Sequence, residues 1–126
     1  MRRWQGDRSV GLEADHLEQQ LESRDPDVRL MVQVRNDIPG AFETLVERYQ
    51  NRLVGILFHL VGNLQEAEDL CQEVFLRIYK ARKGYRPRSK FSTWLFTIAN
   101  NLALNFKSNF NSVVKQSFWR RIKIRI

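Results

Sequence analysis

The strongest constraint on the fold is a run of apolar residues at helical spacing between residues 41 and 61. They recur every three or four positions over about five turns, as expected for a helix that buries one face. These residues are Phe42, Leu45, Val46, Tyr49, Leu53, Ile56, Leu57, Leu60 and Val61. Gly62 then ends the run. Only residues 122–126 alternate in the manner of a strand, so the sequence predicts an all-α fold.

Capping signals predict a helix on each side of this run. Asp25 can cap a helix over residues 26–35, with Pro26 at a position where the missing N–H costs nothing. Asn63 can cap a second helix that Gly84 would end, with Glu66 in the capping-box position. The buried stripe expected for this helix is Ala67, Leu70, Cys71, Val74, Phe75 and Ile78.

A last helix is expected from about Ser92 to Lys107, which gives a small antiparallel bundle of about four helices. Residues 26–108 would form this domain. Residues 1–25 carry little apolar periodicity and predict a flexible or weakly helical extension. Residues 109–126 form a basic, aromatic tail that is expected to be disordered.

Charge is divided unevenly along the chain. All 14 acidic residues lie at or before Glu73, whereas residues 74–126 hold 13 Lys or Arg and 10 of the 14 aromatic residues. Cations bind phosphates and flat rings stack on exposed bases, so this half is typical of a nucleic-acid surface. The acidic residues up to Glu73 predict a different partner, one that carries basic groups.

The last predicted helix has an unusual second face of uncharged polar residues opposite its apolar one. A face exposed only to solvent would use Glu and Lys, whereas Asn and Thr are poor helix formers that can read base edges. The face comprises Thr93, Thr97, Asn100, Asn101 and Asn105, with Lys90 and Lys107 near its ends. The alternative is a polar face that packs on another protein.

The segment before this helix combines cations with aromatic rings. Arg86, Arg88 and Lys90 can bind phosphates, and the neighbouring rings can stack on an unpaired base. Those rings are Tyr85, Phe91 and Trp94. The alternative is that Phe91 and Trp94 are core residues.

Other classes of protein have little support in the sequence. Cys71 is the one cysteine, so no internal disulfide is possible, and no secretory signal or membrane-spanning run is present. His16 and His59 are isolated, and no cysteine cluster or glycine-rich phosphate loop occurs. The sequence therefore predicts a cytoplasmic protein that is not an enzyme and uses no metal, cofactor or small-molecule substrate.

Several motifs together resemble region 2 of bacterial sigma factors, most closely the extracytoplasmic-function (ECF) group. They are Ala-Glu-Asp-Leu-Cys-Gln-Glu-Val-Phe-Leu at 67–76, Tyr-Arg-Pro at 85–87, Phe-Ser-Thr-Trp-Leu at 91–95 and Ile-Ala-Asn-Asn at 98–101. The resemblance extends over about residues 26–107. It implies a factor in transcription initiation that binds core RNA polymerase and promoter DNA, with an anti-sigma factor as a possible further partner.

The resemblance assigns polymerase binding to the acidic part of the second capped helix. Asp69, Gln72 and Glu73 match the residues that contact the clamp helices of the β′ subunit. Carboxylates that face an Arg-rich coiled coil would form charge-assisted pairs. The alternative is an acidic helix start that stabilises only its own helix dipole.

The resemblance also implies that the basic loop and the last helix recognise the promoter −10 element, with one flipped base held by the loop. Lys90, Phe91, Thr93 and Trp94 match the loop–helix junction, and Asn100 and Asn101 match positions that face the duplex. Together with the composition argument, the expected DNA-binding residues are Arg86, Arg88, Lys90, Phe91, Thr93, Trp94, Thr97, Asn100, Asn101 and Lys107.

The chain departs from the family pattern in two ways. Thr97-Ile98 stands where primary sigma factors carry paired tryptophans, which predicts weaker promoter melting. The family also continues into region 4, which residues 110–126 do not resemble, so the chain would be a truncated fragment or a region-2-only relative. The tail offers another alternative, because its cations and large apolar groups at 118–124 would suit attachment to an anionic membrane.

Overall fold

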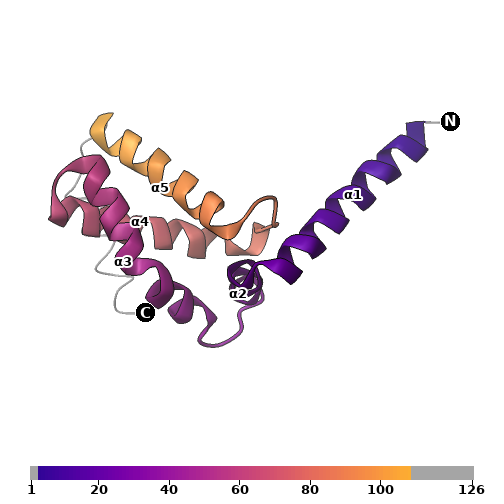
Figure 1. Ribbon diagram of the computed structural model, residues 1–126, viewed down its shortest axis with the longest axis horizontal. Coiled ribbons are helices and arrows are strands. Elements are labelled where there is room, and N and C mark those ends of the chain that lie inside the picture. Colours follow the sequence, from indigo (N-terminus) through magenta and orange to yellow (C-terminus); the bar gives the residue numbers. More distant parts are fainter. Residues whose placement is uncertain (1–2, 109–126) are drawn as a thin grey trace.

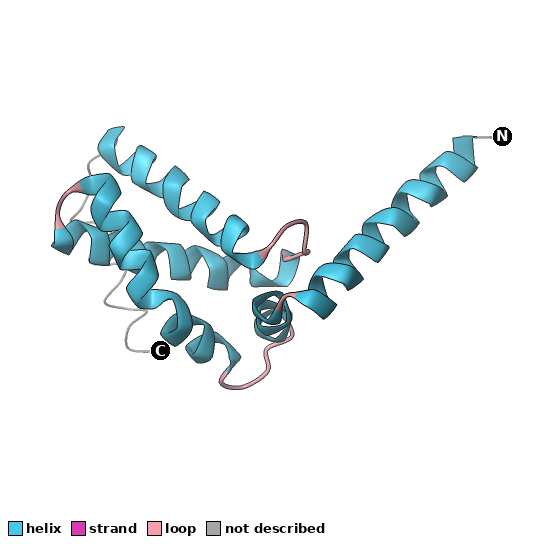
Figure 2. Cartoon of the chain, in the orientation of Figure 1, coloured by secondary structure: helices cyan, strands magenta, loops and turns pink. Residues whose placement is uncertain are grey.

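The structure is a computed structural model that describes the backbone of residues 3–108 and the side chains of residues 13–106. Within this part the chain is helical and contains no strand (Figure 2). The helices are α1 (Arg3–Arg24), α2 (Pro26–Arg35), α3 (Ala41–Val61), α4 (Leu64–Ala81), a 3-10 turn η1 (Arg82–Gly84) and α5 (Phe91–Ser108). The predicted all-α class is therefore confirmed.

Helices α3, α4 and α5 lie beside one another and form the body of the bundle (Figure 1). Helix α2 packs at the end of the bundle where α5 begins, and α1 projects away from it. The core between the helices is apolar. It includes Leu45, Leu53 and Leu57 of α3, Leu70, Val74 and Ile78 of α4, and Leu95, Ala99 and Leu102 of α5.

Local capping places the starts of α2 and α4 and the end of α3 where the sequence predicts them. The Asp25 carboxylate accepts a hydrogen bond from the backbone N–H of Asp27 at 2.9 Å, and the Asn63 side chain accepts one from Glu66 N–H at 3.1 Å. Gly62 adopts φ 75° and ends α3, a conformation that favours glycine. Gly84 does not end α4 directly, because α4 ends at Ala81 and continues as η1.

For residues 1–25 the sequence predicts a flexible or weakly helical extension. The structure has a 22-residue helix there, and its last turns are held against the domain. The Arg29 guanidinium donates to the carbonyls of Glu22 and Ser23 at 3.1 and 2.9 Å, and Leu21 packs against the core. These contacts satisfy carbonyls that the end of a helix leaves without partners, and they hold the last turns of α1 against α2.

A second polar cluster joins α2 to α3. Asp27 accepts a hydrogen bond from the Tyr49 hydroxyl and forms an ion pair with Arg48. Burial, together with this contact to Asp27, raises the pKa of Tyr49. The orientation of α2 is thus fixed by both apolar and polar contacts.

None of the helices in the part of the chain described is long and apolar enough to cross a membrane. The basic tail, on which the alternative of membrane attachment depends, lies outside the described residues, as does the prediction that it is disordered.

Candidate functional site

The predicted polar face of α5 is exposed on the surface of the bundle. Thr93, Thr97, Asn100 and Asn101 are all solvent-accessible, while the opposite face of the helix is buried in the core. The Thr97 hydroxyl donates to the Thr93 carbonyl at 2.7 Å, one turn earlier. The four side chains therefore form a continuous surface of hydroxyl and amide groups along one helix. Asn105 continues this face, whereas the Lys107 side chain lies outside the described part of the chain.

The N-terminus of α5 is held by a residue from the beginning of α2. The second carboxylate oxygen of Asp25 accepts a hydrogen bond from Phe91 N–H at 2.9 Å, while its first oxygen caps α2. One carboxylate thus satisfies N–H groups at the starts of two helices. This contact fixes the junction between the basic loop and α5.

The aromatic residues near this junction differ in accessibility. Phe91 has an exposed fraction of 0 %, and its ring packs against Tyr49 and Trp94 with centroid distances of 5.2 and 5.7 Å. The structure therefore places Phe91 in the core, where its ring cannot reach a ligand. Trp94 is only partly buried and can present part of its indole. Of the three rings named from the sequence, Tyr85 and Phe91 are buried and Trp94 is partly exposed.

Tyr85 is buried and packs against Trp94. Its ring lies 4.9 Å from that of Trp94, and its hydroxyl is buried without a hydrogen-bond partner among the described residues. Burial raises the pKa of Tyr85 to about 12. Its carbonyl accepts a hydrogen bond from the Arg35 guanidinium at 3.1 Å, so the start of the loop is anchored to α2.

The loop cations point to solvent, but two of them already have acidic partners. The Arg86 and Arg88 side chains are 59 % and 61 % exposed, and Lys90 is exposed. Arg86 pairs with Glu18 of α1 at 2.9 Å, and this hydrogen bond raises the pKa of Arg86. The sequence predicted the cations but gave no sign of this partner, because 68 residues separate the two side chains.

A shallow groove of about 190 Å³ lies between α4 and α5, beside the polar face. Trp94, Ile98 and Asn101 line it from α5, and Arg77 lines it from α4. The groove thus combines apolar walls with a guanidinium and two amides, those of Asn101 and Asn105. Sequence reasoning did not select Arg77. Its position four residues after Glu73, with which it pairs at 3.9 Å, was the available signal.

The three residues matched to polymerase binding lie on neighbouring turns of α4 and are all half-buried. The Glu73 side chain is only 14 % exposed and pairs with Arg77. The Asp69 carboxylate accepts a hydrogen bond from Gln65 at 3.3 Å. Asp69, Gln72 and Glu73 thus form a continuous patch, but the two carboxylates already have partners within α4.

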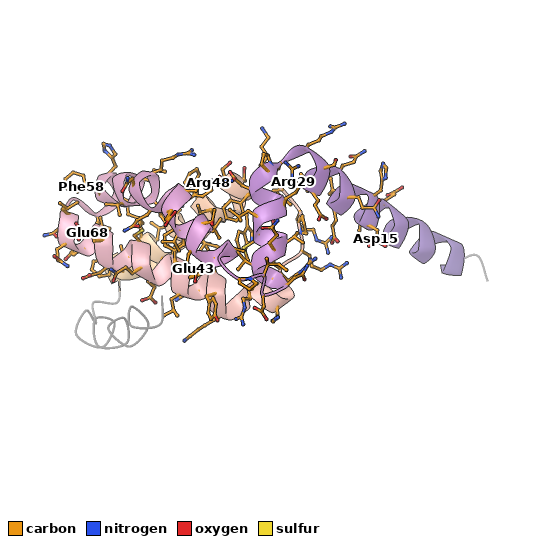
Figure 3. The ribbon with its side chains drawn as sticks, turned by 90° about the horizontal axis from the view of Figure 1, so that it is seen from below. Asp15, Arg29, Glu43, Arg48, Phe58 and Glu68 are labelled. Atoms are coloured by element: carbon orange, nitrogen blue, oxygen red, sulfur yellow. The ribbon has the colours of Figure 1, made fainter. Side chains whose placement is uncertain are left out.

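Figure 3 labels two exposed residues near the start of α4, at the end of the bundle away from α1. Glu68 and Phe58 both reach solvent there, and the exposed fraction of Phe58 is 43 %. Sequence analysis assigned neither to the polymerase surface. Among the described residues, no group of His, Cys, Asp or Glu side chains is arranged to hold a metal ion.

Comparison with curated proteins finds ECF and related sigma factors. The chain is 37 % identical over 83 residues to the RNA polymerase sigma-H factor of Pseudomonas aeruginosa, a match that covers 66 % of this chain and 43 % of that protein. It is 37 % identical over 73 residues to the ECF RNA polymerase sigma factor SigW of Bacillus subtilis, covering 58 % of this chain and 39 % of SigW. The chain thus spans less than half the length of these relatives.

A solved structure and a family model agree with these relatives. An engineered region 2 of sigmaE, solved by NMR in complex with GTAAAA, superposes with a TM-score of 0.57 at 34 % identity, covering 63 % of this chain and 82 % of that one. The model of Sigma-70 region 2 matches residues 45–109, just over half of the chain. The protein therefore belongs to the sigma-70 region 2 family.

Proposed function

We propose that this chain acts in transcription initiation as an ECF-type region 2 domain in the bacterial cytoplasm, binding core RNA polymerase through α4 and −10 promoter DNA through the basic loop and α5. The observation that carries the proposal is the exposed Thr–Asn face of α5, which directly follows a loop of three cations. The role is binding and positioning, with no bond chemistry.

The chemistry of the α5 face fits recognition of bases rather than simple solvation. Each Asn amide can donate and accept at once, and each Thr offers a hydroxyl beside a methyl group. Asn100 and Asn101 lie one turn beyond Thr97, so the reading surface follows the helix axis. Arg86, Arg88 and Lys90 would bind phosphates and set the register of the strand.

Trp94 is the ring that remains available to an unpaired base. It is partly exposed and lines the groove between α4 and α5, where Asn101 and Arg77 also lie. Stacking on an aromatic face binds single-stranded bases with little dependence on sequence. In this proposal Phe91 holds Trp94 in position from the core and does not bind DNA itself.

Polymerase binding is assigned to the patch of Asp69, Gln72 and Glu73. The ion pair between Glu73 and Arg77 is long, at 3.9 Å, and therefore weak. A basic coiled coil would replace Arg77 as the partner of the Glu73 carboxylate. The half-buried positions favour a contact that excludes water, where charge-assisted hydrogen bonds are strongest. An anti-sigma factor would act by covering this patch or the α5 face.

Binding to purified core RNA polymerase tests the first contact. The native chain should bind, and the double variant Gln72→Ala/Glu73→Arg should lose at least about tenfold in affinity, since truncating one partner of an interfacial charge pair costs about 2 kcal/mol or more. Glu47→Arg is the matched control, because it makes the same charge change at an exposed residue of another helix, α3. If the folded native chain fails to bind at low salt, the proposed function is wrong.

Binding to labelled single-stranded DNA tests the second contact, and GTAAAA is a suitable first probe because an engineered sigmaE region 2 forms a complex with it. Asn101→Ala should weaken binding to the preferred sequence by about 1–3 kcal/mol while leaving binding to other sequences nearly unchanged. Lys90→Gln should weaken binding to all sequences alike. Equal effects of Asn101→Ala on every sequence would refute base recognition by α5.

A further inference from the structure

The acidic side of α1 lies against the basic loop that precedes α5. Glu18 holds Arg86 with both carboxylate oxygens, one 2.9 Å from Nε and the other 3.4 Å from a terminal nitrogen. Asp15 lies 3.7 Å from Arg86, and Arg88 lies 4.0 Å from Glu18. A guanidinium binds a phosphate in the same two-point geometry that Arg86 uses here.

The position of α1 is set by contacts that do not involve these ion pairs. Arg29 donates to the carbonyls of Glu22 and Ser23, and Asp25 N–H donates to the Leu21 carbonyl at 2.9 Å. Leu21 also packs against the core. The last turns of α1 are therefore fixed, and Figure 1 shows the loop before α5 beside this end of the helix.

Helix α1 lies outside the segment that matches the Sigma-70 region 2 model. The Sigma-70 region 2 match begins at residue 45, so Asp15 and Glu18 lie outside it, whereas Arg86 and Arg88 lie inside it. The ion pairs thus join Arg86 and Arg88 of the matched segment to Asp15 and Glu18 of α1. The two carboxylates stand where phosphates would bind.

We propose that α1 is a built-in competitor of DNA, in which Asp15 and Glu18 hold Arg86 and Arg88 in the free protein and DNA phosphates displace them on binding. This inference rests on the proposed function, because it concerns the same basic loop. The α1 carboxylates would thus lower the affinity for DNA, and a partner that moves α1 would raise it.

The ion pairs have the strength that such a competitor needs. Arg86 and Arg88 are more than half exposed, and exposed pairs are weak enough for a phosphate to displace them. When DNA displaces the carboxylates, the loop cations release counterions from the phosphates, but the freed carboxylates take up cations from solution. The net release of ions on binding is therefore smaller than it would be for unpaired cations. Freeing both cations should therefore steepen the salt dependence of binding.

The test compares the full chain with the double variant Asp15→Asn/Glu18→Gln, using a labelled single-stranded oligonucleotide between about 50 and 200 mM salt. The variant should bind about threefold to tenfold more tightly, as expected for the loss of two exposed ion pairs. The slope of log K against log salt should steepen by about 0.7 for each freed cation. Circular dichroism verifies that the variant keeps its helices.

A second double variant, Glu13→Gln/Glu43→Gln, removes the same charge from exposed positions that contact no loop cation within the described residues. It should leave affinity and slope close to those of the native chain. Adding Arg86→Gln to Asp15→Asn/Glu18→Gln should abolish most of the gain, since Arg86 is the cation that would be freed.

Three outcomes separate this inference from the proposed function. A gain that is specific to Asp15→Asn/Glu18→Gln supports it. Equal binding by the native chain and this variant overturns it and leaves the proposed function intact, as does an equal gain in the control variant. If no form binds DNA while core polymerase binding persists, both the competitor and the DNA-binding role are refuted.

Discussion

Replacing Asp25 with alanine removes the acceptor for two helix starts at once. Its two carboxylate oxygens accept hydrogen bonds from Asp27 N–H and Phe91 N–H, each at 2.9 Å. A helix cap of this kind is worth about 1 kcal/mol, and a partly buried N–H left without an acceptor costs about 1–3 kcal/mol. The expected loss in the free energy of unfolding is therefore about 2–4 kcal/mol.

Asn63→Ala is the matched comparison, because Asn63 makes one cap hydrogen bond, to Glu66 N–H. It should cost about 1 kcal/mol. Asp25→Asn should also cost about 1 kcal/mol, since an amide keeps one acceptor oxygen and loses the other.

Urea unfolding followed by circular dichroism measures all three variants. With a slope of about 1–3 kcal/mol per molar urea, Asp25→Ala should lower the midpoint by about 1 M without changing the slope. If Asp25→Ala costs no more than Asn63→Ala, the carboxylate does not serve both helices and the reasoning fails.

Further predictions concern three buried residues, Phe91, Tyr85 and Cys71. Phe91→Ala should cost about 3–5 kcal/mol of unfolding free energy in the same assay, because its ring is fully buried; a cost below about 1 kcal/mol would contradict a core role. Tyr85→Phe should be neutral or stabilising by up to about 1 kcal/mol, because it removes a hydroxyl buried without a partner among the described residues. Because the pKa of Tyr85 is raised in the folded state, the folded state binds the phenol proton more tightly than the unfolded state does. The native chain should therefore lose stability as pH rises from 10.0 to about 12. Tyr85→Phe should lose less stability when unfolding is measured at the two ends of this range. Burial raises the pKa of the Cys71 thiol to about 12, so Ellman's reagent should label Cys71 at neutral pH only across the unfolding transition, and rapid labelling of the native chain would refute its burial.

The sequence was most informative where short-range rules decide the structure. The predicted bounds of α3 match the structure, since Gly62 ends the helix by its own backbone conformation and the apolar period runs without interruption. The Asn63 cap and the buried stripe of α4 follow from residues three or four positions apart. The polar face of α5 was predicted for the same reason.

Contacts between distant residues could not be read from the sequence. Periodicity cannot tell which rings at the start of α5 face inward, and Phe91 is buried because Tyr49 and Trp94 surround it. Helix α1 has little apolar periodicity, and its last turns depend on Arg29. The second bond of Asp25 and the pairing of Arg86 with Glu18 span 66 and 68 residues, so neither has a local signal.

Helix α2 supplies part of the core on which α3 and α5 also pack. Val28 and Met31 have no exposed surface, and they belong to the same core as α3 and α5. A fragment cut at residue 45, where the match to the Sigma-70 region 2 model begins, would lose both side chains and leave an unfilled cavity in its interior. The segment matched by that model is thus shorter than the segment that forms the core. A graft of this domain into another sigma factor should therefore begin no later than Asp25.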